Sequence, residues 1–246
     1  MTAADLRRLA PDLPTARFGR PLHIYESAPS TNDLARRLAE DGAAEGTAVL
    51  ALTQTRGRGR LGRSWASPPG GLYLSVVLRP ELPPARWPLL ALAVALGAAA
   101  GAEEASGIAV KLKWPNDLVT EEGKVGGVLL EAGPDHAVAG IGINAAPPAA
   151  DLPPGAAALG VPLPPLVQAV LWHVERSVDL AYADPRRILA PWRARCVTLG
   201  RRIRIAGTEA VEGVAEDVDG DGALIVRTPA GVRRIVAGDV AIRDEE

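Results

Sequence analysis

IAVKLKWPNDLVTEEGKVGGVLLEAGPDHAVAGIGIN, residues 108–144, is a series of short apolar runs separated by turn residues. Apolar and polar residues alternate over residues 108–113, and further runs occupy residues 118–119, 125–131 and 137–144. Runs of this length, bounded by Pro, Asn, Asp and Gly, are typical of strands joined by turns. Strands with short connections pair antiparallel, so the stretch predicts a mostly antiparallel sheet.

The residues that precede this stretch predict two more strands and two helices. Residues 47–53 and 71–78 are apolar runs typical of buried strands. Residues 30–42 predict a short amphipathic helix, because they begin with good N-cap residues and end at glycine. Residues 88–106 predict a buried core helix, since their apolar part, residues 88–102, is shorter than the roughly 20 residues that span a bilayer.

The residues that follow it predict a loop, two helices and a second domain. Residues 145–165 are rich in alanine and proline and predict a loop, followed by helices over residues 166–183 and from about residue 185. After Cys196 short strand-like runs alternate with AGT, DGDG and TPAG turns, which is typical of a small barrel. The prediction is an α+β fold: a mixed, mostly antiparallel sheet flanked by helices in residues 1–196, then a C-terminal SH3-like β-barrel in residues 197–246.

Composition excludes several classes of protein. A hydrophobic content of 48% is enough for a substantial core, and a net charge of −2, from 27 basic and 29 acidic residues, is unlike a polycation that coats nucleic acid. Cys196 is the only cysteine, which excludes an intramolecular disulfide and a cysteine-rich zinc site. The three histidines are scattered, and the first 14 residues contain no apolar run that drives secretion. We expect a cytoplasmic protein.

The segment QTRGRGRLGRSW, residues 54–65, predicts an anion site. Four arginines and three glycines lie within residues 56–63, and such a cluster of like charges resists ordering until an anion neutralises it. Glycine lets backbone N–H groups approach a phosphate or carboxylate, while arginine supplies a permanent charge and a fork of donors. The alternative is a solvated basic loop or a nucleic-acid tether, which the single aromatic, Trp65, and the flanking core strands disfavour.

Three further segments are individually weaker signals. In KLKWPNDL, residues 111–118, the strand ends at a turn that presents Asn116 and Asp117. A Pro-Asn-Asp turn is also common where a strand simply ends, with no functional role. In GKVGGVLLE, residues 123–131, Lys124 precedes paired glycines that indicate close approach by a ligand or simply a bulge. GIGIN, residues 140–144, is a small-residue strand that ends in an amide and is equally well explained by packing.

In this order and spacing, the four segments resemble the signature blocks of bacterial biotin-protein ligases, also called biotin to acetyl-CoA-carboxylase ligases. The resemblance covers residues 24–144 by motif and the rest by element order, and it implies the fold of the class II synthetase and biotin ligase type. It also implies an ATP-dependent enzyme that forms biotinyl-5'-AMP from biotin and ATP, then transfers biotin to a specific lysine of a biotin carboxyl carrier domain. ATP and Mg²⁺ are the implied cofactors, and the metal ligands are unknown, since we expect the ion to arrive on the ATP phosphates.

The resemblance also implies the roles of single residues. Those implied to bind biotin are Ser30, Thr31, Asn32, Gln54, Gly57, Arg58, Gly59, Arg60 and Lys124. Those implied to bind ATP or the adenylate are Arg58, Arg60, Arg63, Trp65, Lys113, Asn116, Lys124 and Asn144. Lys124, Arg60 and Asp117 are the implied catalytic residues. Asp117 either takes the proton of the acceptor lysine or only supports its turn, and both roles stay open.

The implied partners are a carrier domain of acetyl-CoA or related carboxylases, with no DNA and no membrane, in a monomer or homodimer. Only about 29 residues precede Ser30, so we expect no helix-turn-helix there. The rival enzyme is a lipoate ligase or acyl transferase, whose pocket would suit a flexible chain rather than the polar residues 30–32 and Gln54. The rival binding module is a biotin-responsive regulator or an RNA-binding protein, and the latter predicts salt-dependent association with nucleic acid.

Overall fold

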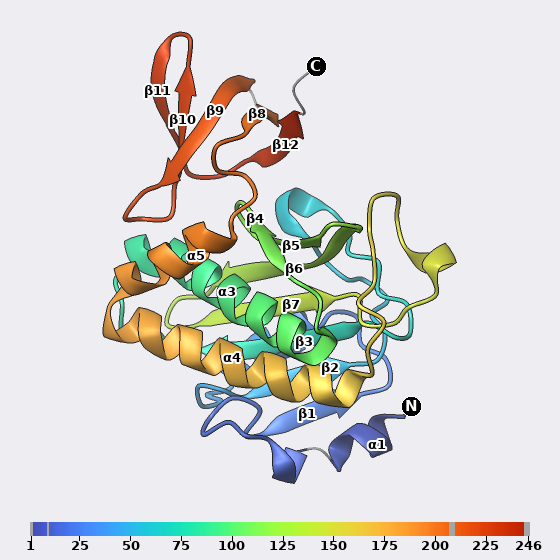
Figure 1. Cartoon of the computed structure of the whole chain (residues 1–246). Helices are drawn as coiled ribbons and strands as arrows, with labels where there is room; N and C mark the ends of the chain where they lie inside the picture. The colour runs from blue at the N-terminus through green and yellow to red at the C-terminus, as the bar shows by residue number, and fades with distance from the viewer. Residues whose placement is uncertain (1, 9, 207–209, 244–246) are drawn as a thin grey trace.

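The computed structural model describes residues 2–8, 10–206 and 210–243, which form two sheets (Figure 1). The first part of the chain contains seven strands: β1 (Leu22–Tyr25), β2 (Ala48–Ala51), β3 (Leu72–Leu78), β4 (Lys111–Lys113), β5 (Asp117–Thr120), β6 (Gly123–Ala132) and β7 (Ala137–Ile143). Its helices are α1 (Ala3–Arg7), α2 (Thr31–Glu40), α3 (Trp87–Ser106), α4 (Leu163–Ala183) and α5 (Leu189–Arg195). The 3₁₀ turns among its described residues are Ala10–Asp12, Arg60–Gly62, Pro84–Arg86, Ala149–Asp151 and Pro185–Ile188.

The seven strands form one mixed sheet in the order β1-β2-β3-β7-β6-β5-β4. β1 and β2 are parallel, because α2 provides the crossover that parallel neighbours require. The other neighbouring strands are antiparallel. Short turns join the three consecutive pairs from β4 to β7, as antiparallel neighbours allow. The prediction of a mixed, mostly antiparallel sheet flanked by helices is therefore confirmed.

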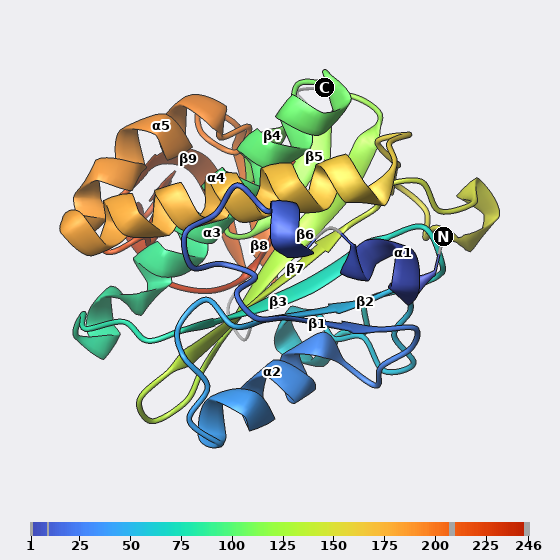
Figure 2. The ribbon, with the colours of Figure 1, turned by 90° about the horizontal axis from the view of Figure 1, so that it is seen from below.

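Two long helices cover one face of this sheet, and α2 lies on the other (Figure 2). α3 and α4 pack closely because a β-carbon at Gly97 or Gly101 would lie about 2.5 Å from the backbone of α4. Among the described residues one helix, Pro84–Ser106, is long and apolar enough to cross a membrane, yet 72% of its most apolar part is buried inside the protein. α3 is thus the core helix that the sequence predicts.

The face that carries α2 is only partly filled with side chains. A small cluster of Ala35, Ala39, Val49, Val77 and Val138 packs α2 onto β2, β3 and β7. Further along the same face the register places Gly127 of β6 opposite Gly142 of β7, and Gly140 beside β3. Since glycine has no side chain, this end of the face is an open floor.

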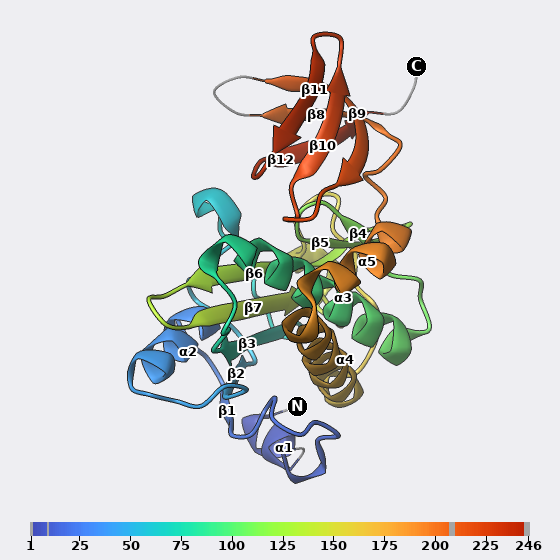
Figure 3. The same cartoon turned by 90° about the vertical axis from the view of Figure 1, so that its left-hand side faces the viewer.

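The C-terminal part is a five-stranded antiparallel sheet in the order β11-β10-β9-β8-β12, beyond α5 (Figure 3). Its strands are β8 (Arg202–Ala206), β9 (Val211–Val218), β10 (Leu224–Thr228), β11 (Gly231–Ile235) and β12 (Asp239–Arg243). This agrees with an SH3-like domain, although within residues 202–206 and 210–243 no pairing closes β11 onto β12. Residues 207–209 and 244–246 of the predicted domain lie outside the described residues.

The sequence patterns predicted the first residues of one strand and one helix wrongly. The strand expected over residues 108–113 begins at Lys111, because Gly107 ends α3 in the left-handed region and Val110 N–H donates to Glu103 Oε2. The helix expected from residue 166 begins at Leu163, since the first turn of a helix tolerates prolines whose missing N–H would be unpaired. The short elements α1 and β1 were not predicted.

Candidate active site

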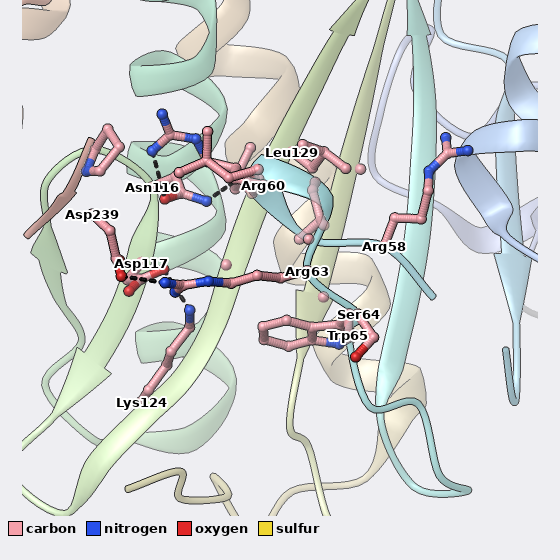
Figure 4. Close-up of a pocket in the computed structure, with 18 of the residues that line it drawn as sticks. Arg58, Arg60, Arg63, Ser64, Trp65, Asn116, Asp117, Lys124, Leu129 and Asp239 are labelled. Carbon is pink, nitrogen blue, oxygen red and sulfur yellow. Dashed lines mark hydrogen bonds and ion pairs between the residues drawn. The ribbon is translucent and has the colours of Figure 1, made fainter. Parts of the chain in front are cut away.

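A pocket lies on the α2 face of the first sheet, between α2, strands β4–β7 and the segment of residues 56–63, here called the arginine loop (Figure 4). It brings together most of the residues that the sequence predicts for the site: Ser30, Thr31, Asn32, Gln54, Arg58, Gly59, Arg60, Arg63, Trp65, Lys113, Asn116, Asp117 and Lys124. Residues 54 to 65 connect β2 to β3, which explains how they reach the glycine floor of the neighbouring strands.

The floor of the pocket is made of glycines that admit an indole ring. A β-carbon at Gly142 would lie 2.7 Å from the ring of Trp65, and one at Gly127 would lie 3.6 Å from it. The ring therefore rests on the sheet where side chains are absent. Lys124 Nζ lies 5.4 Å from the centroid of the same ring, within the range of a cation–π contact.

One end of the pocket is neutral and polar. Ser30 precedes α2 as its N-cap residue, but its hydroxyl does not cap the helix. The backbone N–H of Thr31 donates to Gln54 Oε1 at 2.8 Å, the Thr31 hydroxyl lies 3.1 Å from the same oxygen, and Gln54 Nε2 donates to Ser67 Oγ at 2.9 Å. Because buried polar groups are held by such partners, this end is preorganised before any ligand arrives.

Arg58 stands apart from the other arginines of the loop (Figure 4). Its Nη1 donates to Asp33 Oδ1 at 2.6 Å, and its Nη2 donates to both carboxylate oxygens of Glu131 at 2.7 and 2.9 Å. Burial alone would lower the pKa of Arg58, but hydrogen bonds and charges from Glu131 and Asp33 raise it above its usual value. Asn32 Nδ2 also donates to Glu131, at 2.7 Å.

The other end of the pocket is cationic. Lys124 Nζ donates to Asp117 Oδ1 at 2.6 Å, and Arg60 Nη1 donates to Asn116 Oδ1 at 3.3 Å. Asn116 is held in turn by Val128, whose carbonyl accepts from Asn116 Nδ2 at 2.7 Å. Burial lowers the pKa of Arg60, and the charges of nearby carboxylates offset this only in part. An anionic ligand would stabilise such a half-buried guanidinium.

The C-terminal sheet forms part of the pocket wall through residues 238–240. Arg63, at the end of the arginine loop, is paired with Asp239 of β12. Sequence patterns did not predict this contribution, because Asp239 is an isolated acidic residue far from every motif. The arrangement places residues from both sheets around one space.

Two of the predicted residues lie outside the pocket lining. Asn144 is buried, and its Nδ2 donates to the carbonyl of Ala157 at 2.9 Å. A β-carbon at Gly57 would lie 2.5 Å from the carbonyl oxygen of Trp65, so this glycine permits the loop to fold back on itself. Their contacts with nucleotide and biotin remain predictions.

Four polar residues that support the pocket were missed by sequence reasoning: Asp33, Ser67, Ser75 and Glu131. Ser75 carried a signal, since it is the only polar residue of the apolar run LYLSVVL apart from a tyrosine. Glu131 ends another strand-like run and resembles an ordinary surface residue in sequence. Its partners lie 73 and 99 residues away in the chain.

Within residues 2–8, 10–206 and 210–243 no group of three or more His, Cys, Asp or Glu side chains could hold a metal ion. Both carboxylates near the cationic end, Asp117 and Asp239, are already paired with cations. A divalent ion here would need oxygen ligands brought by the substrate. With one polar and one cationic end, the pocket suits a molecule that has a neutral polar head and an anionic tail.

Known proteins share both the sequence and the fold of this chain. The family model described as "Biotin/lipoate A/B protein ligase family" matches residues 24–145, and "Biotin protein ligase C terminal domain" matches residues 198–243. A relative from Paracoccus denitrificans, "Biotin--[acetyl-CoA-carboxylase] ligase", is 40% identical over 86% of this chain and 96% of its own length. A relative of the same name from Mycobacterium tuberculosis is 35% identical over 96% of this chain and 94% of its own length.

Two solved structures extend the likeness to bound molecules. The biotin protein ligase from Aquifex aeolicus in complex with biotin and ATP has a TM-score of 0.79 and 29% identity, covering 91% of this chain and 99% of its own. The biotin protein ligase from Leishmania major in complex with biotinyl-5-AMP has a TM-score of 0.62 and 29% identity, covering 88% of this chain and 98% of its own.

Proposed function

This chain belongs to the biotin/lipoate A/B protein ligase family, and we propose from that premise how its pocket performs the reaction. The enzyme is a ligase that activates biotin with ATP as biotinyl-5'-AMP and then transfers biotin to a lysine of a carboxylase carrier protein. One pocket joins a neutral polar end to a cationic end. Biotin has the matching form, because its ring system is a neutral urea and its side chain ends in a carboxylate.

The polar end is the proposed site of the urea ring. Ser30, Thr31, Asn32 and Gln54 offer hydroxyl and amide groups there, three of them from the N-cap and first two residues of α2. A site built from buried polar groups rejects ligands that leave those groups unpaired, because each unpaired group costs the full desolvation free energy. A urea ring satisfies them better than an apolar dithiolane does, which favours biotin over lipoate.

The cationic end is the proposed site of the first step. An oxygen of the biotin carboxylate attacks the α-phosphorus of ATP, the new P–O bond forms, and pyrophosphate leaves with the electrons of the broken bond. Two anionic groups about 4 Å apart repel each other by about 4 kcal/mol at the effective dielectric of a half-buried site. Lys124 and Arg60 offset this repulsion, provided that Lys124 exchanges its contact with Asp117 for the reacting anions.

We propose that Mg²⁺ enters as part of the ATP complex. In the described part of the chain the carboxylates do not gather into a metal site, so the phosphates and water would supply most of its ligands. The ion would neutralise phosphate charge. The protein's own part is to hold the nucleotide, for which Trp65, Lys113, Asn116 and Arg63 are placed around the pocket and Asn144 lies behind it.

The second step is attack by the acceptor lysine on the carbonyl carbon of the mixed anhydride, with AMP as the leaving group. The attacking amine must be neutral, and with a free pKa near 10.4 only about one lysine in 2,500 is neutral at pH 7. Asp117 is the carboxylate beside Lys124, so it becomes free to accept the amine proton once Lys124 contacts the phosphate. Its supporting role in the turn remains the alternative.

The compartment, the domain boundaries and the acceptor protein are also part of the proposal. A protein whose only cysteine is Cys196 suits the reducing cytoplasm. We propose residues 1–196 as the catalytic domain and residues 197–246 as the small domain. The acceptor would be a biotin carboxyl carrier domain of acetyl-CoA carboxylase or a related carboxylase.

Transfer of labelled biotin to a purified carrier domain tests this function. With wild type and Lys124→Ala measured with and without ATP, we expect ATP-dependent transfer that falls at least about a hundredfold in the variant, because a charge-stabilising contact is lost. Biotin binding by wild type without any transfer to a competent acceptor would instead favour a biotin-responsive module.

A further inference from the structure

Two side chains outside the pocket hold the residues that line its polar end. Glu131, on β6, accepts from Asn32 Nδ2 at 2.7 Å. Ser75, on β3 and fully buried, donates to Asn32 Oδ1 at 2.6 Å and lies 2.8 Å from Thr31 Oγ1. Asn32 can lie flat on the sheet between them because Gly140 has no side chain; a β-carbon there would lie 2.2 Å from Asn32 Oδ1.

The chemistry of Glu131 fixes the orientation of the Asn32 amide. A carboxylate paired with the guanidinium of Arg58 can only accept hydrogen bonds. Asn32 must therefore turn its NH₂ group toward Glu131 and its oxygen toward Ser75. The reverse orientation would place two oxygens against each other at hydrogen-bond distance.

The assignment of donors and acceptors continues from Asn32 along a chain of hydrogen bonds. Ser75 has one hydroxyl proton, which Asn32 Oδ1 receives. The proton between Ser75 Oγ and Thr31 Oγ1, which lie 2.8 Å apart, must therefore come from the Thr31 hydroxyl. Gln54 Oε1 accepts the backbone N–H of Thr31, so Gln54 presents its NH₂ group to Ser67. The oxygen of Thr31 is then an acceptor, whereas Asn32 and Gln54 each keep one amide proton as a donor.

We propose that Glu131 sets this hydrogen-bond polarity and so acts as a positioning residue for the urea ring of the substrate. The inference rests on the proposed function, because it takes biotin as the ligand. A cyclic urea carries two N–H donors and one carbonyl acceptor, so its fit depends on which pocket atoms donate and which accept. Reversing the polarity would set donors against donors.

Glu131→Gln is the sharpest test, because an amide of the same shape can donate as well as accept. The substituted side chain could present its own NH₂ to Asn32, which would allow the Asn32 amide and the groups beyond it to adopt both orientations. We expect biotin affinity to fall about tenfold, as for the loss of one charge-assisted hydrogen bond. The KM for ATP at saturating biotin should stay within about twofold, whereas general damage to the fold would raise both constants.

Asp33→Asn distinguishes this mechanism from one in which Glu131 acts only by anchoring the side chain of Arg58. Asp33 bonds Arg58 and Arg36 but has no bond to Asn32. If Glu131 acted only by anchoring Arg58, both variants would weaken biotin binding alike. Ser75→Ala is the second test, since it removes the next hydroxyl of the chain and leaves Glu131 in place.

Calorimetric titration of biotin, without ATP, into wild type and the three full-length variants decides the matter. The expected result is a loss of about tenfold for Glu131→Gln and for Ser75→Ala, with Asp33→Asn within about threefold of wild type. Wild-type affinity in Glu131→Gln, or an equal loss in Asp33→Asn, would overturn the inference while the ligase assignment stands. A wild type that binds no biotin would instead overturn the proposed function.

Discussion

The arginines of the loop differ in how far neighbouring carboxylates already neutralise their positive charge. Arg58 has two carboxylate partners and Arg63 has one, at an exposed site. Arg60 donates to the neutral oxygen of Asn116, and burial lowers its pKa. A guanidinium that is partly desolvated and weakly compensated gains most from an incoming anion, so the loop's capacity to bind phosphate or carboxylate is concentrated at Arg60.

Alanine substitutions test this ranking. Arg60→Ala should reduce kcat/KM for adenylate formation, measured as pyrophosphate release, by at least about thirtyfold, because a desolvated contact to the reacting anions is lost. Arg63→Ala should lower it less, by about threefold, since the Arg63 guanidinium is exposed, screened by water and already paired with Asp239. Equal losses in the two variants would contradict the ranking.

The sequence could predict which residues meet at the site but not how they are neutralised. The four motifs brought Lys124, Arg60, Asn116 and Trp65 into one pocket, because glycine patterns and strand ends are local signals. The partners of those residues are set by tertiary contacts between distant strands. Glu131 is an example: it faces α2 only because β6 pairs with β7 in one particular register.

At the scale of elements, a buried carboxylate attaches the N-terminal segment to α4. Glu175 of α4 is 5% exposed and accepts hydrogen bonds from the backbone N–H groups of Ala16, Arg17 and Phe18, at 2.7 to 2.9 Å. Burial would raise the pKa of Glu175, but these three donors and the charge of Arg17 hold it below its ordinary value of 4.5. The attachment therefore depends on the ionised form.

Stability should depend on pH through this group. Because the folded-state pKa lies below the unfolded one, the stabilisation is present above about pH 4.5 and is lost as the pH falls through the folded value. Glu175→Gln should lower the melting temperature by about 5 °C at pH 7, for a loss of about 2 kcal/mol, and by less at pH 3. Asp179→Asn, on the same helix but exposed, is the control and should shift it by less than about 1 °C. The same deficit for Glu175→Gln at both pH values would show that its charge is not responsible.

Apolar patterns predicted the elements that bury many residues and failed for a short element that buries few. α2 lies close to its predicted bounds because its apolar residues follow one helix face, and β3 and β7 because their apolar runs are buried almost throughout. β1 is four residues long with one buried residue, so its sequence carries little pattern. Its place at the edge is fixed instead by parallel pairing with β2.

At the scale of the whole molecule, the small sheet and the pocket are joined through Trp114. This side chain is fully buried, its Nε1 donates to the carbonyl of Gly222 at 3.1 Å, and its backbone N–H donates to Thr198 Oγ1 at 3.0 Å. Trp114 also begins the turn that presents Asn116 and Asp117 to the pocket. The small sheet thus supports the cationic end of the pocket from behind, in addition to forming part of its wall at residues 238–240.

Two tryptophans allow the contribution of this bond to be measured. Trp192 is as fully buried as Trp114, but its Nε1 has no hydrogen-bond partner. Trp114→Phe and Trp192→Phe therefore remove similar apolar area, whereas only the first leaves a buried carbonyl unpaired. In urea unfolding, Trp114→Phe should lose about 1 to 2 kcal/mol more than Trp192→Phe. Its KM for ATP should also rise several-fold, because the turn that carries Asn116 loosens. Equal stability losses with an unchanged KM would mean that packing alone joins the two sheets, and that the small sheet acts on the pocket only through the wall it provides.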